Sequence, residues 1–327
     1  MTTIETSQPR TWTERLNIRR FPALLAVLLT LFLLAVNAAV QPNFFSIYII
    51  ESNITTFLPL MIIAVGQAYV VLGGSIDLSL GSIVSLVNVV VVVVAEALGG
   101  GGNALPVAMV CGIGAGLICG LINGILIGVF RLQAVVTSFA TSIVISGVAL
   151  IVLPQAGGAL PPVYYLTYAS RFLGIPVVAW FLLALLVFVW WFSGTRTYAY
   201  LMATGGNKQA AFQTGLSIQR SRLLSHTMAG GFSALAALCI LGVAGAGDPL
   251  MGQAFTLASV SAVVLGGMSL AGGWGGAGGA ILGAAILGLI NNLIFFSNIN
   301  YVYQSVVQGT MVLLALAGGV FLSRRPH

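Results

Sequence analysis

The sequence predicts an all-α integral membrane protein with about ten transmembrane helices, and composition and patterning both support this. Of the 327 residues, 59% are hydrophobic and only 6% are charged, and the mean hydropathy is +1.07. Soluble globular domains carry about 25% charged residues, so this composition excludes that class. The apolar residues form runs of about 20, which is the length an α-helix needs to cross a bilayer.

The expected spans follow one another with short connections. We place them at 21–40, 54–72, 81–98, 105–128, 133–153, 176–193, 223–245, 255–270, 276–296 and 302–322. The first run could instead be the core of a cleaved signal peptide, but such cores have only about 7–15 residues. The chain therefore divides into an N-terminal tail (1–20), a transmembrane domain (21–322) and a C-terminal tail (323–327).

Basic residues predict how the chain is oriented. They form three clusters, before the first span, in the central loop and at the end of the chain: Arg10, Arg15, Arg19 and Arg20; Arg196, Lys208, Arg220 and Arg222; Arg324 and Arg325. Lys and Arg favour the cytoplasmic side of a membrane, so all three clusters and both termini should be cytoplasmic. Because the basic residues lie at the ends of spans, nucleic-acid binding is a poor explanation for them. We expect a multi-pass membrane protein.

A lone carboxylate, Asp77, lies between two apolar runs and is surrounded by glycines. Within a bilayer a charge costs about 2.5–3.5 kcal/mol and usually faces a partner or a wet cavity. The glycines before and after it let the backbone leave helical geometry. Asp77 could therefore belong to a broken helix that faces a path, or it could cap a helix that starts after Ser79. The two interpretations are compatible, and we take Gly74, Asp77 and Ser79 as candidate pathway residues.

The stretch 203–215 predicts a short cytoplasmic helix. Asn207 can cap it, residues 208–214 can form two turns with Phe212 as an apolar knob, and Gly215 can end it. It could be a solvated connector, but an Ala-Ala-Phe face without an obvious intrachain cover favours contact with a partner. The candidate contact residues are Gly205, Gly206, Asn207, Ala210, Ala211 and Gly215.

Glycine spacing predicts close helix packing. Gly112, Gly116 and Gly120 recur every four positions, as do Gly275 and Gly279, and small residues at this spacing let membrane helices approach closely. The tetrapeptide Val-Leu-Gly-Gly occurs at 71–74 and again at 264–267, each time at the end of an apolar run. This echo indicates either a duplicated transporter core or a chance match.

No constellation for catalysis, metal binding or a cofactor is found. The two histidines, His226 and His327, are far apart, and no Cys or His cluster has metal-ligand spacing. No Gly-x-x-x-x-Gly-Lys-Ser/Thr motif is present, and the glycine-rich segment 266–276 is followed by no Lys. Any energy for transport must therefore come from outside this chain.

Four motifs in order resemble the ribose-type sugar permeases of bacterial ABC importers. They are Gly-Gly-Ser-Ile-Asp-Leu-Ser-Leu-Gly at 73–81, Ile-Asn-Gly at 122–124, Gly-Gly-Asn at 205–207 and the segment 262–273. The resemblance implies a vitamin B12/ribose-permease-like architecture, a homodimer or heterodimer of permeases, a pair of cytoplasmic ATPase subunits and a periplasmic solute-binding protein. It also implies that 205–215 is the helix that couples to the ATPase, that 154–175 is part of the binding-protein surface, and that the protein lies in the bacterial inner membrane.

The sequence departs from the family pattern in places that bear on the solute. Ser75 replaces a usual glycine, Trp274 replaces a frequent Arg, and 133–147 matches only loosely, so the particular sugar is not predicted. An ion-coupled secondary transporter, in which Asp77 binds a proton or Na⁺, is the alternative. An intramembrane enzyme ranks last, because paired catalytic residues are lacking.

Overall fold

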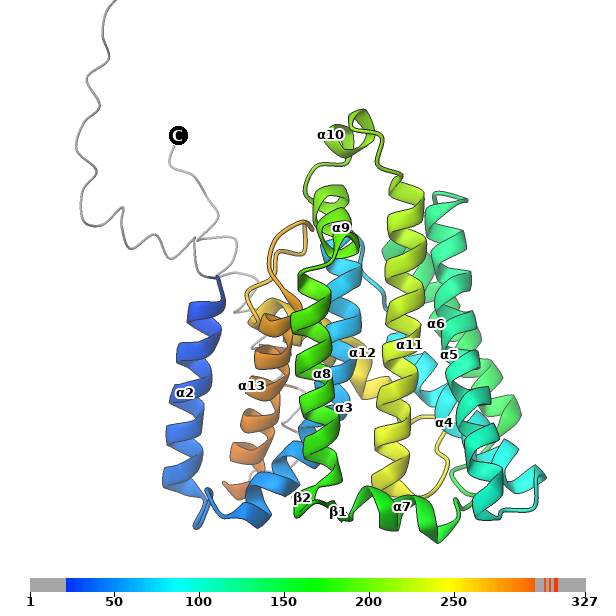
Figure 1. Ribbon diagram of the computed structural model, residues 1–327, viewed down its shortest axis with the longest axis vertical. Coiled ribbons are helices and arrows are strands. Elements are labelled where there is room, and N and C mark those ends of the chain that lie inside the picture. Colours follow the sequence, from blue (N-terminus) through cyan, green and yellow to red (C-terminus); the bar gives the residue numbers. More distant parts are fainter. Residues whose placement is uncertain (1–21, 298–302, 304–305, 307–308, 311–327) are drawn as a thin grey trace, which may run out of the picture.

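The computed structural model describes residues 22–297 together with 303, 306, 309 and 310. The long helices run side by side as a bundle, with α10 at one end and α7, β1 and β2 at the other (Figure 1). The helices are α2 (Pro22–Val40), α3 (Ile47–Leu72), α4 (Leu80–Ala97), α5 (Leu105–Gly128), α6 (Ala134–Val152), α7 (Pro162–Tyr168), α8 (Val177–Ser193), α9 (Arg196–Gly206), α10 (Lys208–Gln213), α11 (Ile218–Ala244), α12 (Gln253–Leu265) and α13 (Ala277–Phe296). A short 3₁₀ helix, η2 (Gly102–Ala104), precedes α5, and β1 (Arg171–Phe172) pairs antiparallel with β2 (Ile175–Pro176).

Among the described residues, six helices are long and apolar enough to cross a membrane, namely α3, α4, α5 with η2, α6, α11 and α13. A seventh span results if α8 and α9, which are bent by 71° relative to each other, count as one. The mostly helical membrane fold is confirmed, whereas a count of ten spans is not. The expected span at 302–322, both tails and the basic clusters at the chain ends lie outside the described residues.

The expected span at 255–270 is not confirmed as a full-length helix. It is the 13-residue helix α12, which is about 20 Å long at 1.5 Å per residue and too short for a hydrocarbon core about 30 Å thick. The helix ends at Leu265 because Gly266 and Gly267 form its C-terminal cap. The apolar run continues beyond the cap, so hydropathy alone overestimates the helix.

Capping residues also move other boundaries away from the apolar runs. α3 begins seven residues before its expected start at 54, because the Ser46 hydroxyl accepts a hydrogen bond from the backbone N–H of Ile49 at 3.4 Å. The region around 196–206, expected as loop, is helix α9, whose first turn is capped by Thr195 at 3.2 Å from the Tyr198 nitrogen. The segment 154–175 contains α7 and the small β-hairpin.

α11 lies at the centre of the bundle and packs against α5, α3 and α4. Its contact with α5 depends on the predicted glycines: a Cβ added at Gly116 would lie 2.8 Å from the Gly230 carbonyl oxygen, and one at Gly120 would lie 3.1 Å from the Gly230 Cα. The predicted close packing is confirmed there. Gly275, however, lies in the loop before α13 with φ +107°, so it shares no helix with Gly279.

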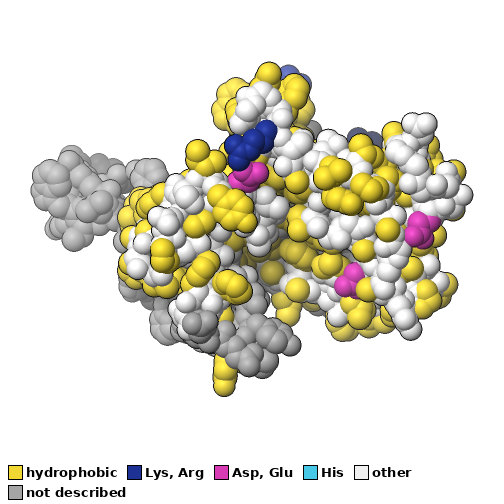
Figure 2. Space-filling model, turned by 90° about the horizontal axis from the view of Figure 1, so that it is seen from below, with side chains coloured by type: hydrophobic (Ala, Val, Ile, Leu, Met, Phe, Trp, Pro, Cys, Tyr) yellow, Lys and Arg dark blue, Asp and Glu magenta, His cyan; other side chains and the backbone are white. Residues whose placement is uncertain are grey.

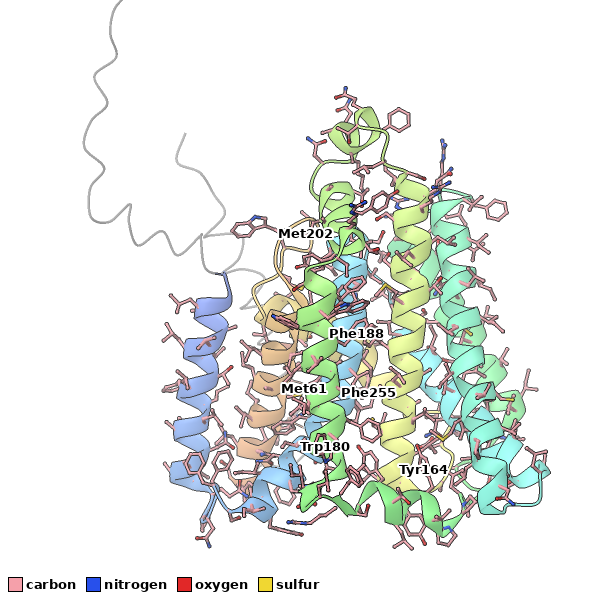
Figure 3. The ribbon with its side chains drawn as sticks, viewed as in Figure 1. Met61, Tyr164, Trp180, Phe188, Met202 and Phe255 are labelled. Carbon is pink, nitrogen blue, oxygen red and sulfur yellow. The ribbon has the colours of Figure 1, made fainter. Side chains whose placement is uncertain are left out.

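An aromatic cluster fills the space between α3, α8 and α11 (Figure 3). The ring centroid of Tyr69 lies 4.8 Å from that of Phe192 and 5.8 Å from that of Phe232. The ring of Phe188 packs against both phenylalanines. Tyr164 on α7 donates a hydrogen bond to the Leu238 carbonyl at 2.9 Å, which fastens the end of the bundle to α11.

Charge differs between the two ends. Acidic side chains are scattered over the α7 end (Figure 2), where Glu51 pairs with Arg171 at 2.7 Å and Glu96 accepts from the Ala159 nitrogen at 3.0 Å. The α10 end of the described chain carries basic residues, namely Arg131, Arg196, Lys208, Arg220 and Arg222.

Candidate functional site

Asp77 is the centre of a fully buried polar network. One carboxylate oxygen accepts from the Ser79 backbone N–H at 2.8 Å and from the Ser79 hydroxyl at 2.6 Å. The other oxygen lies 2.7 Å from Nδ1 of His226 on α11. Asn123 on α5 donates to the Ser79 hydroxyl at 2.7 Å, and all four side chains are 0% exposed. The network therefore joins the connection between α3 and α4 to two neighbouring helices.

The end of α3 positions this network. Gly74 adopts φ +73°, its N–H bonds to the Val71 carbonyl at 2.9 Å, and the Ser75 N–H bonds to the Val70 carbonyl at 3.1 Å. This is a Schellman cap, which requires a residue in the left-handed region and so favours glycine. The chain then runs through Asp77, and α4 begins at Leu80.

The second Val-Leu-Gly-Gly forms the same cap at the end of α12. Gly267 adopts φ +80°, its N–H bonds to the Val264 carbonyl at 2.9 Å, and the Met268 N–H bonds to the Val263 carbonyl at 3.1 Å. The repeated Val-Leu-Gly-Gly sequence therefore forms the same helix cap at the ends of α3 and α12.

The arrangement determines what Asp77 does in this conformation. An ionised carboxylate requires Nδ1 of His226 to carry the proton, so the imidazole is a donor towards Asp77. Asp77 accepts from the N–H of Ser79, the N-cap residue of α4, but no side chain accepts a hydrogen bond from the first turn of α4 itself. Nε2 of His226 and Oδ1 of Asn123 are buried without a partner. Asp77 is fully buried, and its carboxylate joins the connection between α3 and α4 to His226 on α11.

The coupling segment has the predicted caps. Oδ1 of Asn207 accepts from the backbone nitrogens of Gln209 at 3.1 Å and Ala210 at 3.0 Å, and α10 follows. Gly215, at φ +81°, ends it, as predicted. Phe212 is 72% exposed, but Ala211 is only 4% exposed. The expectation that this face lacks an intrachain cover is therefore wrong for Ala211, which faces the rest of the chain.

Gly205 and Gly206 lie in the last turn of α9 and not in a loop. A Cβ at Gly205 would overlap the Leu72 carbonyl oxygen and would lie 2.9 Å from the nitrogens of Gly74 and Gly273. The Gly273 N–H also donates to the Leu72 carbonyl at 3.1 Å.

Gly272 completes this contact, since a Cβ there would lie 2.6 Å from the Gly74 Cα. We call the set Gly74, Gly205, Gly272 and Gly273 the glycine junction. The structure thereby brings the two predicted groups of site residues into backbone contact.

Sequence reasoning missed three parts of this arrangement. His226 was set aside because it has no second histidine nearby, although an ionisable residue inside an apolar helix is itself a signal for a partner. Asn123 contributed to the family resemblance but was not named as a site residue. Gly272 and Gly273 belong to the family motif 262–273 but are not among the predicted site residues.

Comparisons with known proteins identify the family. Residues 49–316 match the family described as "Branched-chain amino acid transport system / permease component". The chain is 29% identical over 295 residues to the ribose import permease protein of Escherichia coli K12, covering 88% of this chain and 90% of the relative. It is 32% identical over 263 residues to the ribose import permease protein of Bacillus subtilis strain 168, covering 78% and 79%. It is 30% identical over 302 residues to the autoinducer 2 import system permease protein of Salmonella paratyphi B, covering 91% and 84%.

These relatives are transport subunits and not enzymes, and the ion-coupled alternative is not supported. Several apolar helices and permease relatives together indicate a multi-pass inner-membrane protein. The chain belongs to the ribose-type permease family of ABC importers.

Proposed function

We propose that this chain is the permease subunit of an ABC importer and forms the pathway for a sugar or a similar small polar solute. Its relatives are named for the import of ribose and of autoinducer 2, which supports this solute class. On this proposal ATP is hydrolysed by separate subunits, and the chain needs no cofactor of its own.

The α10 end faces the cytoplasm in the proposed topology, with ten spans and both termini on that side. In the described residues, basic side chains collect at the α10 end, whereas Glu51, Glu96 and Asp248 lie at the other. This asymmetry follows the preference of Lys and Arg for the cytoplasmic side. The α7 end then faces the periplasm and receives the solute-binding protein.

The partners are a pair of ATPase subunits, the binding protein and a second permease, identical or not. α10 is the contact for the ATPase: Asn207 and Gly215 fix its ends, and Phe212 projects as an exposed apolar knob. Ala211 is buried on the face of α10 that packs against the rest of the chain. Aromatic anchors of this kind carry much of the binding energy at protein interfaces.

The observation that carries the proposal is the glycine junction. α10 follows Gly206 through one residue, and Gly205 touches Leu72 and Gly74 through backbone atoms alone. A displacement of α10 therefore passes to the end of α3 and to the connection that holds Asp77 and Ser79, because no flexible side chain intervenes. Such a link between an ATPase contact and a break between two spans is what alternating access requires.

Reconstitution tests the proposal. The chain, its cognate ATPase and its binding protein are placed in proteoliposomes with internal or external ATP, and uptake of radiolabelled ribose is followed. We expect uptake to require ATP and both partners. Vesicles with the chain alone, under a proton or Na⁺ gradient, are the control, and accumulation there would contradict the proposal.

A further inference from the structure

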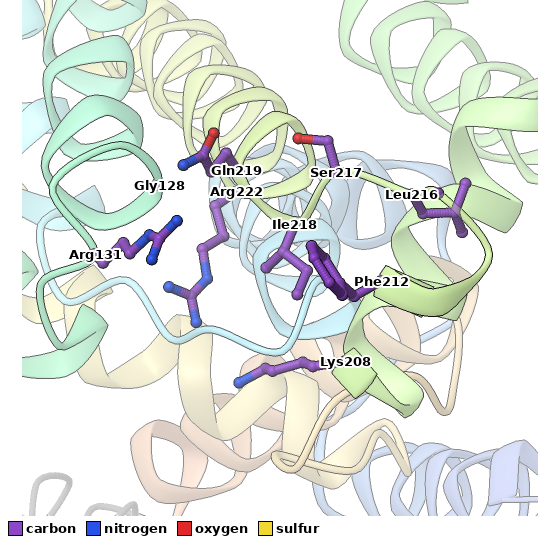
Figure 4. Close-up of a pocket in the computed structure, with 10 residues that line it drawn as sticks. Gly128, Arg131, Lys208, Phe212, Leu216, Ser217, Ile218, Gln219 and Arg222 are labelled. Carbon is purple, nitrogen blue, oxygen red and sulfur yellow. The ribbon is translucent and has the colours of Figure 1, made fainter. Parts of the chain in front are cut away.

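A basic pocket of about 620 Å³ opens beside α10 at the same end of the bundle (Figure 4). Its walls come from the end of α5, from α10 with the connection that follows it, and from the first turns of α11. Three cationic side chains, Arg131, Lys208 and Arg222, line it together with the apolar side chains of Phe212 and Ile218.

The pocket has no counter-charge from the described chain. Glu51, Glu96 and Asp248 lie at the opposite end, and Asp77 is buried against His226. No ion pair is formed by any of the three cations with a described acid. Like charges placed together in this way repel each other, so an anion that enters the pocket is favoured.

Arg222 is held by the backbone of α5, and Arg131 has an unusual backbone conformation. Arg222 donates through Nη1 to the Ile127 carbonyl at the end of α5, at 3.1 Å, while its buried Nε has no acceptor. Arg131 adopts φ +60°, a left-handed conformation that residues with a side chain rarely take. The pocket thus contains one buried donor without an acceptor in the described chain and one basic residue in a left-handed conformation.

We propose that this pocket receives a carboxylate side chain, Asp or Glu, of the ATPase subunit that docks on α10; this inference rests on the proposed function. Lys208 and Phe212 belong both to α10 and to the pocket, so a protein that covers the exposed Phe212 also covers the pocket. Guanidinium groups match the geometry of carboxylates, and Lys208 adds a mobile point charge. The apolar knob would supply affinity, and the carboxylate would fix the register.

The sequence offers a direct test, because Lys208 is the only lysine in the chain. A carbodiimide activates a carboxylate, the amine then attacks it to form an amide, and the reagent leaves as its urea. Because no spacer remains between the two groups, the cross-link reports direct contact. The assembled importer is treated with the reagent, digested and analysed by mass spectrometry. We expect an amide between Lys208 and an Asp or Glu of the ATPase.

Four variants separate the effect of charge from an effect on the fold. Lys208→Glu and Arg131→Gly should each weaken ATPase binding about tenfold or more, and the loss should shrink at high salt. The glycine at 131 suits the left-handed turn, so this variant removes charge without adding strain. Arg220→Glu, on the exposed surface of α11 and outside the pocket lining, is the matched control and should bind normally. Lys208→Arg should keep binding and lose the cross-link.

The outcomes distinguish this inference from the proposed function. ATPase binding that is unchanged in Lys208→Glu and Arg131→Gly, without the cross-link, overturns the carboxylate contact and leaves the ABC permease proposal intact. A cross-link to the chain's own Glu5 or Glu14 overturns it as well. Co-purified anionic phospholipid that is lost in Lys208→Glu, with normal ATPase binding, assigns the pocket to a lipid headgroup. Failure of the wild-type chain to bind any ATPase contradicts both proposals.

Discussion

Replacing Gly205 by alanine tests the glycine junction, and the adjacent Gly206 provides the control. The new methyl group at position 205 would overlap the Leu72 carbonyl oxygen and would crowd two backbone nitrogens at 2.9 Å. All three are main-chain atoms, so no side chain can rotate away. At Gly206 the closest atom would be the Gly273 Cα at 3.7 Å, which is ordinary van der Waals contact.

The expected cost follows from these contacts. Overpacking of this kind costs about 1–3 kcal/mol, and distortion of the hydrogen bond from Gly273 to Leu72 adds about 0.5–1.5 kcal/mol. Gly205→Ala should therefore lower the free energy of unfolding by about 1.5–4.5 kcal/mol, whereas Gly206→Ala should change it by less than about 0.5 kcal/mol. If about 1.4 kcal/mol of the strain falls on only one access state, the equilibrium between the states shifts tenfold.

Two assays measure these effects. Unfolding in a mixed-micelle titration gives the stability of each variant, and ATP-driven ribose uptake by the reconstituted importer gives its function. We expect Gly205→Ala to lose both stability and uptake, and Gly206→Ala to keep both. If Gly205→Ala resembles the wild type in both assays, the backbone contact is not a mechanical link and the reasoning is refuted.

The other predictions concern the buried network and the two ends of the bundle. Asp77→Asn should cost no more than about 1 kcal/mol of unfolding free energy, because the amide oxygen can accept the same bonds and its NH₂ can donate to the ring. His226→Ala should cost about 3–5 kcal/mol, because it leaves a buried carboxylate unpaired; the reverse order in unfolding titrations would refute the network. Phe212→Asp should leave stability unchanged but weaken ATPase binding about 30-fold in a titration, and an unchanged affinity would show that α10 is not the docking helix. Glu51→Gln should cost at most about 1 kcal/mol, less at high salt, because its ion pair with Arg171 is exposed; a larger loss in unfolding titrations would contradict this.

The features that could be predicted from the sequence are those fixed by neighbouring residues. The ends of α10 follow from Asn207 and Gly215, since a capping side chain and a left-handed glycine act within one turn. Close packing of α5 follows from glycines four positions apart, although they do not identify α11 as the partner helix. Long apolar runs also locate most helices, because the hydropathy of a segment depends only on the residues within it.

The features that could not be predicted depend on residues distant in the chain. His226 lies 149 positions after Asp77, and only the fold shows that they meet. Gly205 looked like a loop residue, because glycine needed for close packing and glycine needed for a turn cannot be told apart without the neighbouring helix. α12 was expected to span the membrane because its apolar run continues past the cap at Gly267.

The two Schellman caps explain why the sequence places so much glycine at one level of the bundle. Each cap ends a helix and leaves a connection of non-helical backbone, one before α4 and the other before α13. Inside a membrane such backbone is tolerated only where protein or water satisfies it, so each connection must be covered. Here the connections cover each other: Gly272 lies against Gly74, and the Gly273 nitrogen donates to the Leu72 carbonyl. Because α9 contributes Gly205 to the same contact, a movement of α10 cannot displace one connection and spare the other, and both breaks in the bundle should respond together.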